Sequence, residues 1–277
     1  MRVKLILAYD GTNYQGYQSQ VNGPTVQDAL EDAIESLLGR RIRTMGASRT
    51  DTGVHALGNV VCFDTDSRIP ADKMSFALNA RLPEDIRVLE SSEVPDDFHP
   101  RFQNTIKTYE YHILNRCFPD PLRRNTEMHY YYPLDERKMN EAAQYLVGEH
   151  DFASFASSGY SSKTTVRTIY SANVRREGDR VVFRITGNGF LYNMVRILAG
   201  TLLEIGGGKY PPGRMREILE ACDRSAAGPT AIARGLVLVE ICYPDANSPS
   251  SRMPGSSERT ACPVSGHTVT RNKGVLQ

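Results

Sequence analysis

The sequence lacks three features that quickly place a protein in a class: paired cysteines, a long apolar run and an excess of one charge. Its five cysteines (62, 117, 222, 242 and 262) include no CxxC pair, and an odd number leaves no complete pairing. Neither a zinc site nor a disulfide framework is therefore indicated. The uninterrupted apolar run before Asp10, Leu5–Ala8, is far too short for a signal peptide or a membrane span. We expect a soluble cytoplasmic protein that makes no membrane contact.

A global excess of positive charge is also absent. The chain holds 33 Lys and Arg against 32 Asp and Glu among 277 residues, which gives a formal net charge of +1. An RNA partner would then have to meet a local basic patch. The candidate patches are Arg40-Arg41 with Arg43, Arg101 with Lys107, Arg123-Arg124, and Arg175-Arg176. By default each of them is solvated surface charge.

The first hundred residues predict elements in the order β-α-β-β-α-β. Alternation of apolar residues indicates the strands, and helical spacing indicates the helices. The predicted segments are strands over Val3–Tyr9, Arg41–Met45, Val54–Phe63 and Ile86–Glu93, and helices over Val26–Leu38 and Pro70–Asn79. Thr25 and Asp28 are placed to cap the first helix, and Gly39 is placed to end it.

The second half repeats this order, with one added helix near Met215 to Ala221. The predicted segments are strands over Thr108–Leu114, Val166–Arg175, Arg180–Thr186 and Gly235–Tyr243, and helices over Leu134–Val147 and Phe190–Ile205. We therefore expect an α+β protein made of two pseudo-duplicated, RRM-like units, residues 1–100 and 101–244. Their antiparallel sheets would join into one extended sheet, with a cleft between the halves. The segment 245–277 has six serines, three prolines and three glycines, which predicts a disordered tail.

The segment Gly46–Gly58, with the sequence GASRTDTGVHALG, carries the main functional signal. Asp51 lies between two threonines just after Arg49, and Gly53 and His55 follow closely. Asp and Thr compete for backbone hydrogen bonds, and Gly53 can adopt backbone angles closed to other residues, so the pattern predicts a fixed loop that holds one carboxylate. The Asp-Thr-Gly tripeptide alone is also typical of an ordinary turn between strands.

The longer block Arg-Thr-Asp-Thr-Gly-Val-His-Ala resembles the active-site segment of the tRNA pseudouridine synthases of the TruA type, and the resemblance extends from Val3 to about Tyr243. It implies that Asp51 is the catalytic carboxylate, acting as nucleophile, that Arg49 contacts the substrate, and that Leu236 lines the uracil pocket. It further implies an isomerase acting on uridines 38, 39 and 40 of the tRNA anticodon stem and loop, and a homodimer in which each tRNA touches both subunits. The loop from Asp10 to Gln18 resembles the family's RNA-contacting N-terminal loop.

Arg196 is the second candidate catalytic residue. It interrupts an otherwise apolar helical pattern, and a buried guanidinium requires a carboxylate partner. The residues alone leave a structural ion pair with an unrelated acid as the default interpretation. The resemblance implies instead that Arg196, in Phe-Leu-x-x-Met-Val-Arg, pairs with Asp51. Such a pairing would hold Asp51 ionised where desolvation alone would raise its pKa.

Tyr109 is the third candidate. Alternation places Tyr109 and Tyr111 on one face of a strand, where packing against a helix is the ordinary expectation. A ring beside the catalytic loop can also stack on an unpaired base. The resemblance implies that Tyr109 stacks on the target uracil and takes part in proton transfer. For RNA contact we also name Arg40 and Arg41, a few residues before the Asp51 loop.

The reaction that the resemblance implies needs no cofactor and no metal, because the C1′–N1 bond breaks, the base turns, and C1′ joins C5 without net oxidation. The sequence leaves open whether the carboxylate attacks C1′, attacks the ring or removes the C2′ proton. One alternative is a non-catalytic RNA-binding protein that uses sheet aromatics. Another is metal-assisted hydrolysis through Asp51, His55 and His150, although their spacing does not favour it. His55 is expected to shape the loop.

Overall fold

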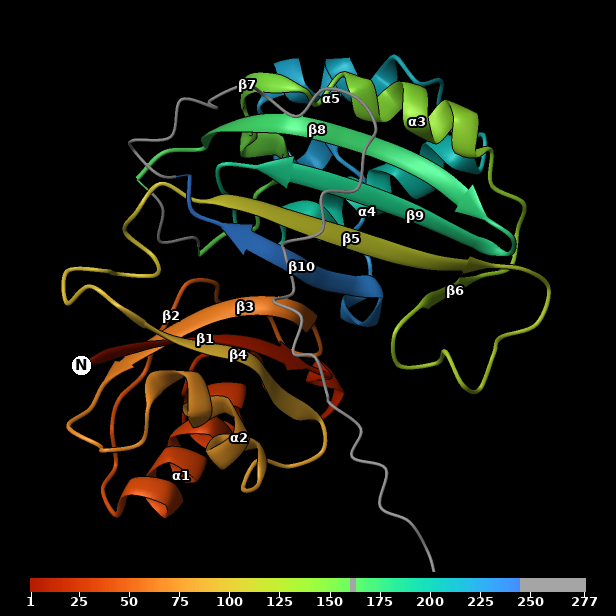
Figure 1. The fold of residues 1–277 in the computed structure, drawn as a ribbon. Coiled ribbons are helices and arrows are strands. Elements are labelled where there is room, and N and C mark those ends of the chain that lie inside the picture. Colours follow the sequence, from red (N-terminus) through yellow and green to blue (C-terminus); the bar gives the residue numbers. More distant parts are fainter. Residues whose placement is uncertain (160–162, 245–277) are drawn as a thin grey trace, which may run out of the picture. The chain divides into compact units, whose positions relative to one another are not determined.

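One mixed sheet organises the part of the chain that the computed structural model describes, residues 1–159 and 163–244. Its strand order is β4-β1-β3-β10-β5-β9-β8-β7, with β2 paired to β3 and β6 paired to β5 (Figure 1). The strands are β1 Arg2–Tyr9, β2 Met45–Gly46, β3 His55–Asp64, β4 Ile86–Val94, β5 Ile106–Asn115, β6 Met128–Tyr130, β7 Gly148–Asp151, β8 Val166–Glu177, β9 Arg180–Gly187 and β10 Leu236–Cys242. The predicted tail from Asp245 lies outside the described residues.

The two halves of the sheet meet at β10, the last described strand. It runs parallel to β3, where Val237 is the partner of His55 and Leu238 is the partner of Ala56, and antiparallel to β5 on its other side. The remaining neighbours along the main strand order are antiparallel. The predicted mixed α+β class with one extended, mostly antiparallel sheet is therefore confirmed.

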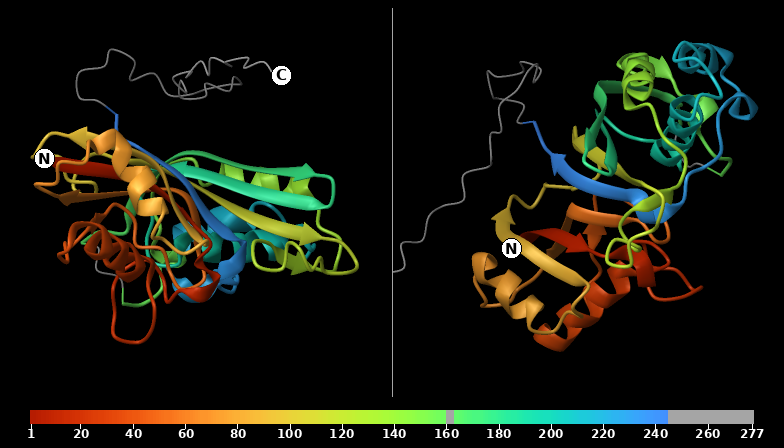
Figure 2. Two further views of the ribbon diagram at one scale, coloured as in Figure 1. Left: turned by 60° about the horizontal axis from the view of Figure 1, so that its bottom comes forward. Right: turned by 90° about the vertical axis from the view of Figure 1, so that its right-hand side faces the viewer.

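The helices pack beside the strands of their own half (Figure 2). In the first half α2 contacts β4 and α1 contacts α2, and in the second half α3 contacts β8 and α4. The helices are α1 Val26–Leu38, α2 Met74–Asn79, α3 Glu136–Gln144, α4 Met194–Gly206 and α5 Arg214–Ala221, and the short 3-10 turns are η1 Gly11–Asn13, η2 Ala71–Lys73, η3 Ala153–Phe155, η4 Arg224–Ala226 and η5 Ala233–Gly235. Within the described ranges no helix has the length and apolar character needed to cross a membrane.

The limits of α1 follow from its sequence. The Thr25 hydroxyl accepts a hydrogen bond from the backbone N–H of Asp28 at 3.1 Å, as an N-cap does. Gly39 adopts a left-handed conformation with φ 73°, where a residue without a Cβ ends a helix at little cost. The capping signals in the sequence thus predicted both ends of this helix.

Three predicted elements are wrong in extent. The expected helix Leu134–Val147 is shortened to α3, Glu136–Gln144, which begins after its N-cap Asp135. The expected strand Arg41–Met45 is reduced to β2, Met45–Gly46, because the N–H of Thr44 donates to the Glu31 carboxylate instead of to a neighbouring strand. The expected helix Phe190–Ile205 begins only at Met194, since Asn193 adopts a left-handed conformation with φ 60° that a helix cannot include.

Candidate active site

Asp51 lies in the loop that connects β2 to β3, and the segment after β1 fixes the shape of this loop. The backbone N–H of Tyr17 donates to the Thr50 carbonyl at 3.1 Å, and the N–H of Gly53 donates to the Tyr14 carbonyl at 3.3 Å. Within the loop, the N–H of Val54 donates to the Asp51 carbonyl at 3.1 Å. The prediction of a fixed loop is therefore confirmed.

Two glycines allow these segments to come together. Gly53 has a φ of 74°, which L side chains rarely adopt. At Gly11 an added Cβ would lie 2.1 Å from the Val54 carbonyl oxygen, so only glycine permits this approach. The loop from Asp10 to Gln18 thus packs against the Asp51 loop, and its predicted RNA contacts stay a prediction.

The predicted ion pair between Asp51 and Arg196 is present. The Arg196 Nη1 atom lies 3.6 Å from Asp51 Oδ2, and the two side chains are 18% and 24% exposed. Arg196 is held in place by two further acceptors: its Nε donates to the Ala231 carbonyl at 2.7 Å, and its Nη1 donates to Asn193 Oδ1 at 2.8 Å. The guanidinium is therefore positioned independently of the carboxylate that it faces.

The electrostatic balance at Asp51 differs from the expectation. Burial raises the pKa of Asp51, and the Arg196 charge lowers it by less, so the net pKa is above the ordinary value. The separation of 3.6 Å is longer than a charge-assisted hydrogen bond, which explains why Arg196 does not fully offset the desolvation. Arg196 limits the rise in pKa and does not reverse it.

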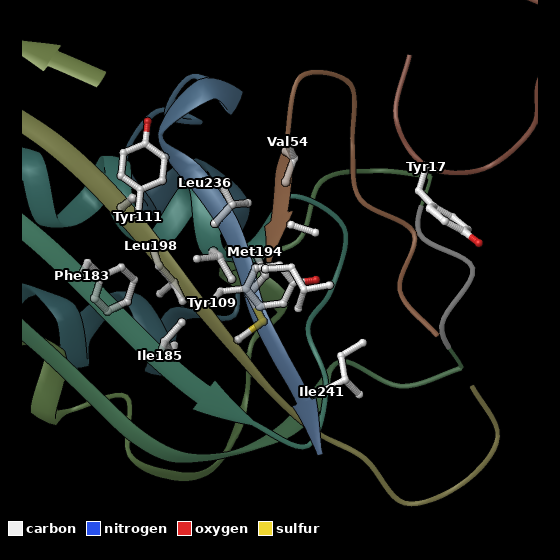
Figure 3. Packing of buried hydrophobic residues seen from close by; sticks show 14 of the residues in the cluster. Tyr17, Val54, Tyr109, Tyr111, Phe183, Ile185, Met194, Leu198, Leu236 and Ile241 are labelled. Carbon is white, nitrogen blue, oxygen red and sulfur yellow. The ribbon is translucent and has the colours of Figure 1, made fainter. Parts of the chain in front are cut away.

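Tyr109 lies on β5, directly beside this ion pair. Its hydroxyl shares a 2.8 Å hydrogen bond with the Ser48 hydroxyl, and its ring meets Phe190 edge-on with 5.1 Å between centroids. Burial raises the pKa of Tyr109 to about 12, and the charge of Asp51 adds to this effect. Figure 3 shows the ring among the buried apolar side chains, with Met194 and Leu236 on the neighbouring α4 and β10.

Leu236 and His55 lie where the two halves of the sheet meet at β10. Leu236 is the first residue of β10 and is 6% exposed. The Nε2 atom of His55 lies 2.8 Å from the Asn125 carbonyl and 3.2 Å from the Arg234 carbonyl, while its Nδ1 lies 3.0 Å from the Gly11 N–H. Both Nε2 partners are acceptors, so Nε2 carries a proton. His55 thus links the first half of the chain to the second, in line with a loop-shaping role.

Three cations, Arg49, Arg101 and Lys107, lie in or near the Asp51 loop. The Lys107 ammonium donates to the Ala47 carbonyl at 2.9 Å, and burial together with the nearby Arg101 lowers its pKa to about 8. Burial and the charge of Arg49 lower the pKa of Arg101. Among the described residues, no ion pair within 4.0 Å joins Arg49, Arg101 or Lys107 to a carboxylate.

The predicted RNA contacts Arg40 and Arg41 have a different environment. Arg40 pairs with Asp66 at 2.5 Å. Arg41 lies within 4.0 Å of four carboxylates, those of Asp28, Glu31, Asp32 and Glu35. These intramolecular ion pairs already occupy both arginines, which argues against RNA contact by Arg40 and Arg41. Their contact with RNA stays a prediction.

The sequence argument missed two side chains that hold the site together. Ser48 bonds the Tyr109 hydroxyl, and Asn193 holds Arg196. Ser48 lies within the recognised segment, so its small polar side chain near Asp51 was an available signal. The sequence offered no such signal at Asn193, because its left-handed backbone conformation is seen only in the folded chain.

The arrangement does not resemble the metal site considered as an alternative. His150 Nε2 lies 3.1 Å from the Val147 carbonyl, and both His55 nitrogens have the backbone partners described above. Across residues 1–159 and 163–244, no three His, Cys, Asp or Glu side chains converge as a metal site requires.

Comparison with known proteins identifies the family. The family model described as tRNA pseudouridine synthase matches residues 5–103 and 142–244. A tRNA pseudouridine synthase A of Acetivibrio thermocellus is 52% identical over 241 residues, which cover 87% of this chain and 99% of that protein. Proteins of the same name from Brevibacillus brevis and Clostridium acetobutylicum are 48% and 47% identical over 242 and 241 residues, again covering 87% of this chain and 99% of each.

Among solved structures, an archaeal box H/ACA sRNP Nop10-Cbf5 complex matches with a TM-score of 0.30 and 13% identity, covering 86% of this chain and 46% of that chain, which is too distant to support an argument. The family match and the identities over nearly the full length of the relatives show that this chain belongs to the tRNA pseudouridine synthase family.

Proposed function

We propose that this protein converts uridine to pseudouridine in tRNA, with Asp51 as the catalytic carboxylate. The observation that carries the proposal is the position of Asp51: a partly buried carboxylate on a fixed loop, 3.6 Å from the Arg196 guanidinium and beside the Tyr109 ring. A protein that only binds RNA has no reason to bury an acid at the cost of a raised pKa. A catalyst must present one carboxylate to a ribose or a base, and this need explains the burial of Asp51.

Each residue then has a separate task. Asp51 reacts as nucleophile or as base while the C1′–N1 bond breaks and the C1′–C5 bond forms, and the proton on C5 leaves as N1 gains one. Arg196 keeps Asp51 oriented and stabilises its ionised form. Tyr109 and Leu236 form the apolar wall against which the uracil turns while detached. Arg49, which is exposed and two residues before Asp51, contacts the substrate backbone.

The target is inferred from the family resemblance. The substrates are uridines 38, 39 and 40 of the anticodon stem and loop, and the active form is a homodimer in the cytoplasm. A base paired in the stem must leave its stack, which costs a few kcal/mol, and the buried pocket offsets part of that cost. The free thiols of Cys62, Cys117 and Cys222 suit a reducing compartment.

We also propose that residues 1–100 and 101–244 are related RRM-like units with the cleft between them. The strand orders support this proposal. The first half pairs β4-β1-β3-β2, and the second half pairs β10-β5-β9-β8. When β6 and β7 are left out and the remaining four strands of each half are numbered along the chain, both halves have the order fourth, first, third, second.

Mapping pseudouridine in tRNA from cells with and without this protein tests the proposal. We expect pseudouridine to disappear at positions 38, 39 and 40 without the protein and to return when the wild-type chain is supplied. An unchanged map would contradict it. A loss of pseudouridine at other tRNA positions would support the proposed reaction and would show that the target uridines are different. In vitro, release of tritium from C5-labelled uridine in tRNA reports turnover directly.

A further inference from the structure

We propose that Arg49, Arg101 and Lys107, here called the cation cluster, form a binding site for one backbone phosphate of the RNA strand that carries the target uridine. This inference rests on the proposed function for the identity of the RNA. It assigns three particular side chains to one phosphodiester, and it excludes the more obvious basic pair at Arg40 and Arg41 from that contact.

The positions of the three side chains follow from two segments that the fold brings together. Lys107 lies on β5, on the same face as Tyr109 two residues later, and its ammonium donates to Ala47 at the start of the catalytic loop. Arg49 is in that loop, two residues before Asp51. Arg101 lies in the connection that leads into β5. The bond from Lys107 to Ala47 therefore places its ammonium at the loop that carries Arg49 and Asp51. Arg101 interacts electrostatically with both Arg49 and Lys107, so it lies near them.

The electrostatics of the cation cluster are unfavourable in the free protein. Burial and the charge of Arg49 lower the pKa of Arg101, and burial and the charge of Arg101 lower the pKa of Lys107. Holding these cations together carries an electrostatic cost, and among the described residues no ion pair within 4.0 Å joins them to a carboxylate. Other arginines of this chain do have such partners. Arg123 bonds Asp120 and Asp179, and Arg176 bonds Glu136. An anion that binds the cation cluster recovers the cost, which makes an anionic ligand the expected occupant.

The expected anion is a phosphodiester. Arg49 is exposed and Arg101 and Lys107 are half-buried, so the cation cluster can be reached from solvent beside the site where the base must enter. A phosphate group presents several acceptor oxygens, which suits two guanidinium groups and one ammonium. A strand whose uridine is turned toward Asp51 carries a phosphate on each side of that nucleotide. One of these phosphates would lie against the cation cluster and fix the register of the target base.

The test measures tRNA affinity against salt concentration in a background of Asp51→Asn, so that no turnover disturbs binding. The double variant Arg49→Gln with Arg101→Gln removes two charges of the cation cluster. Each phosphate contact contributes about 0.7 to 0.9 to the slope of log affinity against log salt. We expect the slope to become shallower by about that amount, and affinity at low salt to fall about tenfold.

The matched control is Arg40→Gln with Arg41→Gln, which removes two arginines that already have acid partners. We expect its slope to equal that of the background. An unchanged slope in the cation-cluster variant, or an equal loss in both variants, would overturn the proposal. Arg49→Gln alone provides a second variant that folding should tolerate because the side chain is exposed, and its slope should fall in the same direction.

A competition with inorganic phosphate at constant ionic strength separates two sources of the anion. If the cation cluster binds phosphate of the RNA, inorganic phosphate should weaken tRNA binding in the background protein and have less effect on the cation-cluster variant. Weakening by phosphate without any change of salt slope would indicate a site for free phosphate and would contradict the RNA contact. Because binding is measured without turnover, a failed pseudouridine assay would count against the proposed function and leave this result intact.

Discussion

Arg41 and Arg196 show how little the number of ion pairs says about function. Arg41 lies just beyond α1, 45% exposed, with four carboxylates within 4.0 Å. Arg196 lies on the buried helix α4 and faces one carboxylate at 3.6 Å. Exposed ion pairs contribute about 0–1 kcal/mol each and are screened by salt. The one ion pair of Arg196 lies where water is scarce, so its removal should affect the site more than the loss of all ion pairs of Arg41.

The largest effect should come from removing the acid that Arg196 faces. Asp51→Asn keeps the shape of the side chain and loses its charge, so we expect turnover to fall by at least about 10³-fold while tRNA binding stays near that of the wild type. Tritium release from C5-labelled tRNA is the measurement. Substantial release by the variant would show that another residue acts as the catalytic group.

Removal of Arg196 should affect both activity and stability. Arg196→Met leaves the Asp51 carboxylate without its cation and leaves the Asn193 and Ala231 oxygens without their donor. We expect the free energy of unfolding to fall by about 1–3 kcal/mol, less than for a fully buried pair because both groups keep some exposure. Arg196→Lys is the control, since it retains charge and loses the planar fork. A melting temperature and turnover equal to those of the wild type in Arg196→Met would place the guanidinium outside the site.

The pH dependence of stability tests the sign of the Asp51 environment. Its folded pKa lies above the ordinary value of about 3.8. The stabilising contribution of the protonated form is therefore present below the ordinary pKa and is lost as pH rises through the folded pKa. At neutral pH the ionised carboxylate destabilises the fold, so Asp51→Asn should be at least as stable as the wild type there. The difference should vanish in acid, as measured by urea unfolding, and a less stable variant at pH 7 would mean that Arg196 more than offsets the burial.

Replacement of Tyr109 should separate its ring from its hydroxyl. The hydroxyl bonds Ser48, and its pKa of about 12 keeps it protonated at neutral pH. We expect Tyr109→Phe to lower turnover less than about tenfold and Tyr109→Ala about 10²-fold, because the ring supplies the apolar wall. Ser48→Ala should match Tyr109→Phe, since both break the same hydrogen bond. Equal losses in Phe and Ala would assign proton transfer to the hydroxyl.

The smallest effect is expected at Arg40 and Arg41. Replacement of both residues by glutamine removes their ion pairs without adding negative charge beside their partner acids, and we expect less than about 1 kcal/mol of lost stability and little change in the salt dependence of tRNA binding. Their intramolecular acids already neutralise these arginines. A clearly shallower salt slope would instead restore the hypothesis, drawn from the sequence, that they contact RNA.

Local patterns of the sequence determined much of the fold. Thr25, Asp28 and Gly39 encode both ends of α1 through hydrogen bonds and a backbone conformation that span only a few residues. The loop around Asp51 was also predictable, because glycine and threonine act on their immediate neighbours. The start of α4 was not, since the left-handed Asn193 makes its side-chain bonds to Ser157 and Arg196.

The sequence by itself therefore determined that Asp51 is held on a loop, and it located most of the long strands and helices. Only the tertiary structure decided which cations have partners. The position of β10 between β3 and β5 brings the loop of Asp51 beside α4 and beside Lys107. The physical reason is the separation along the chain of the residues that interact. Caps and turns form between residues a few positions apart, whereas the ion pair of Asp51 and Arg196 joins distant segments and depends on the path of the whole sheet. Among the described residues, the same folding that gives Arg101 no ion pair within 4.0 Å places four carboxylates around Arg41.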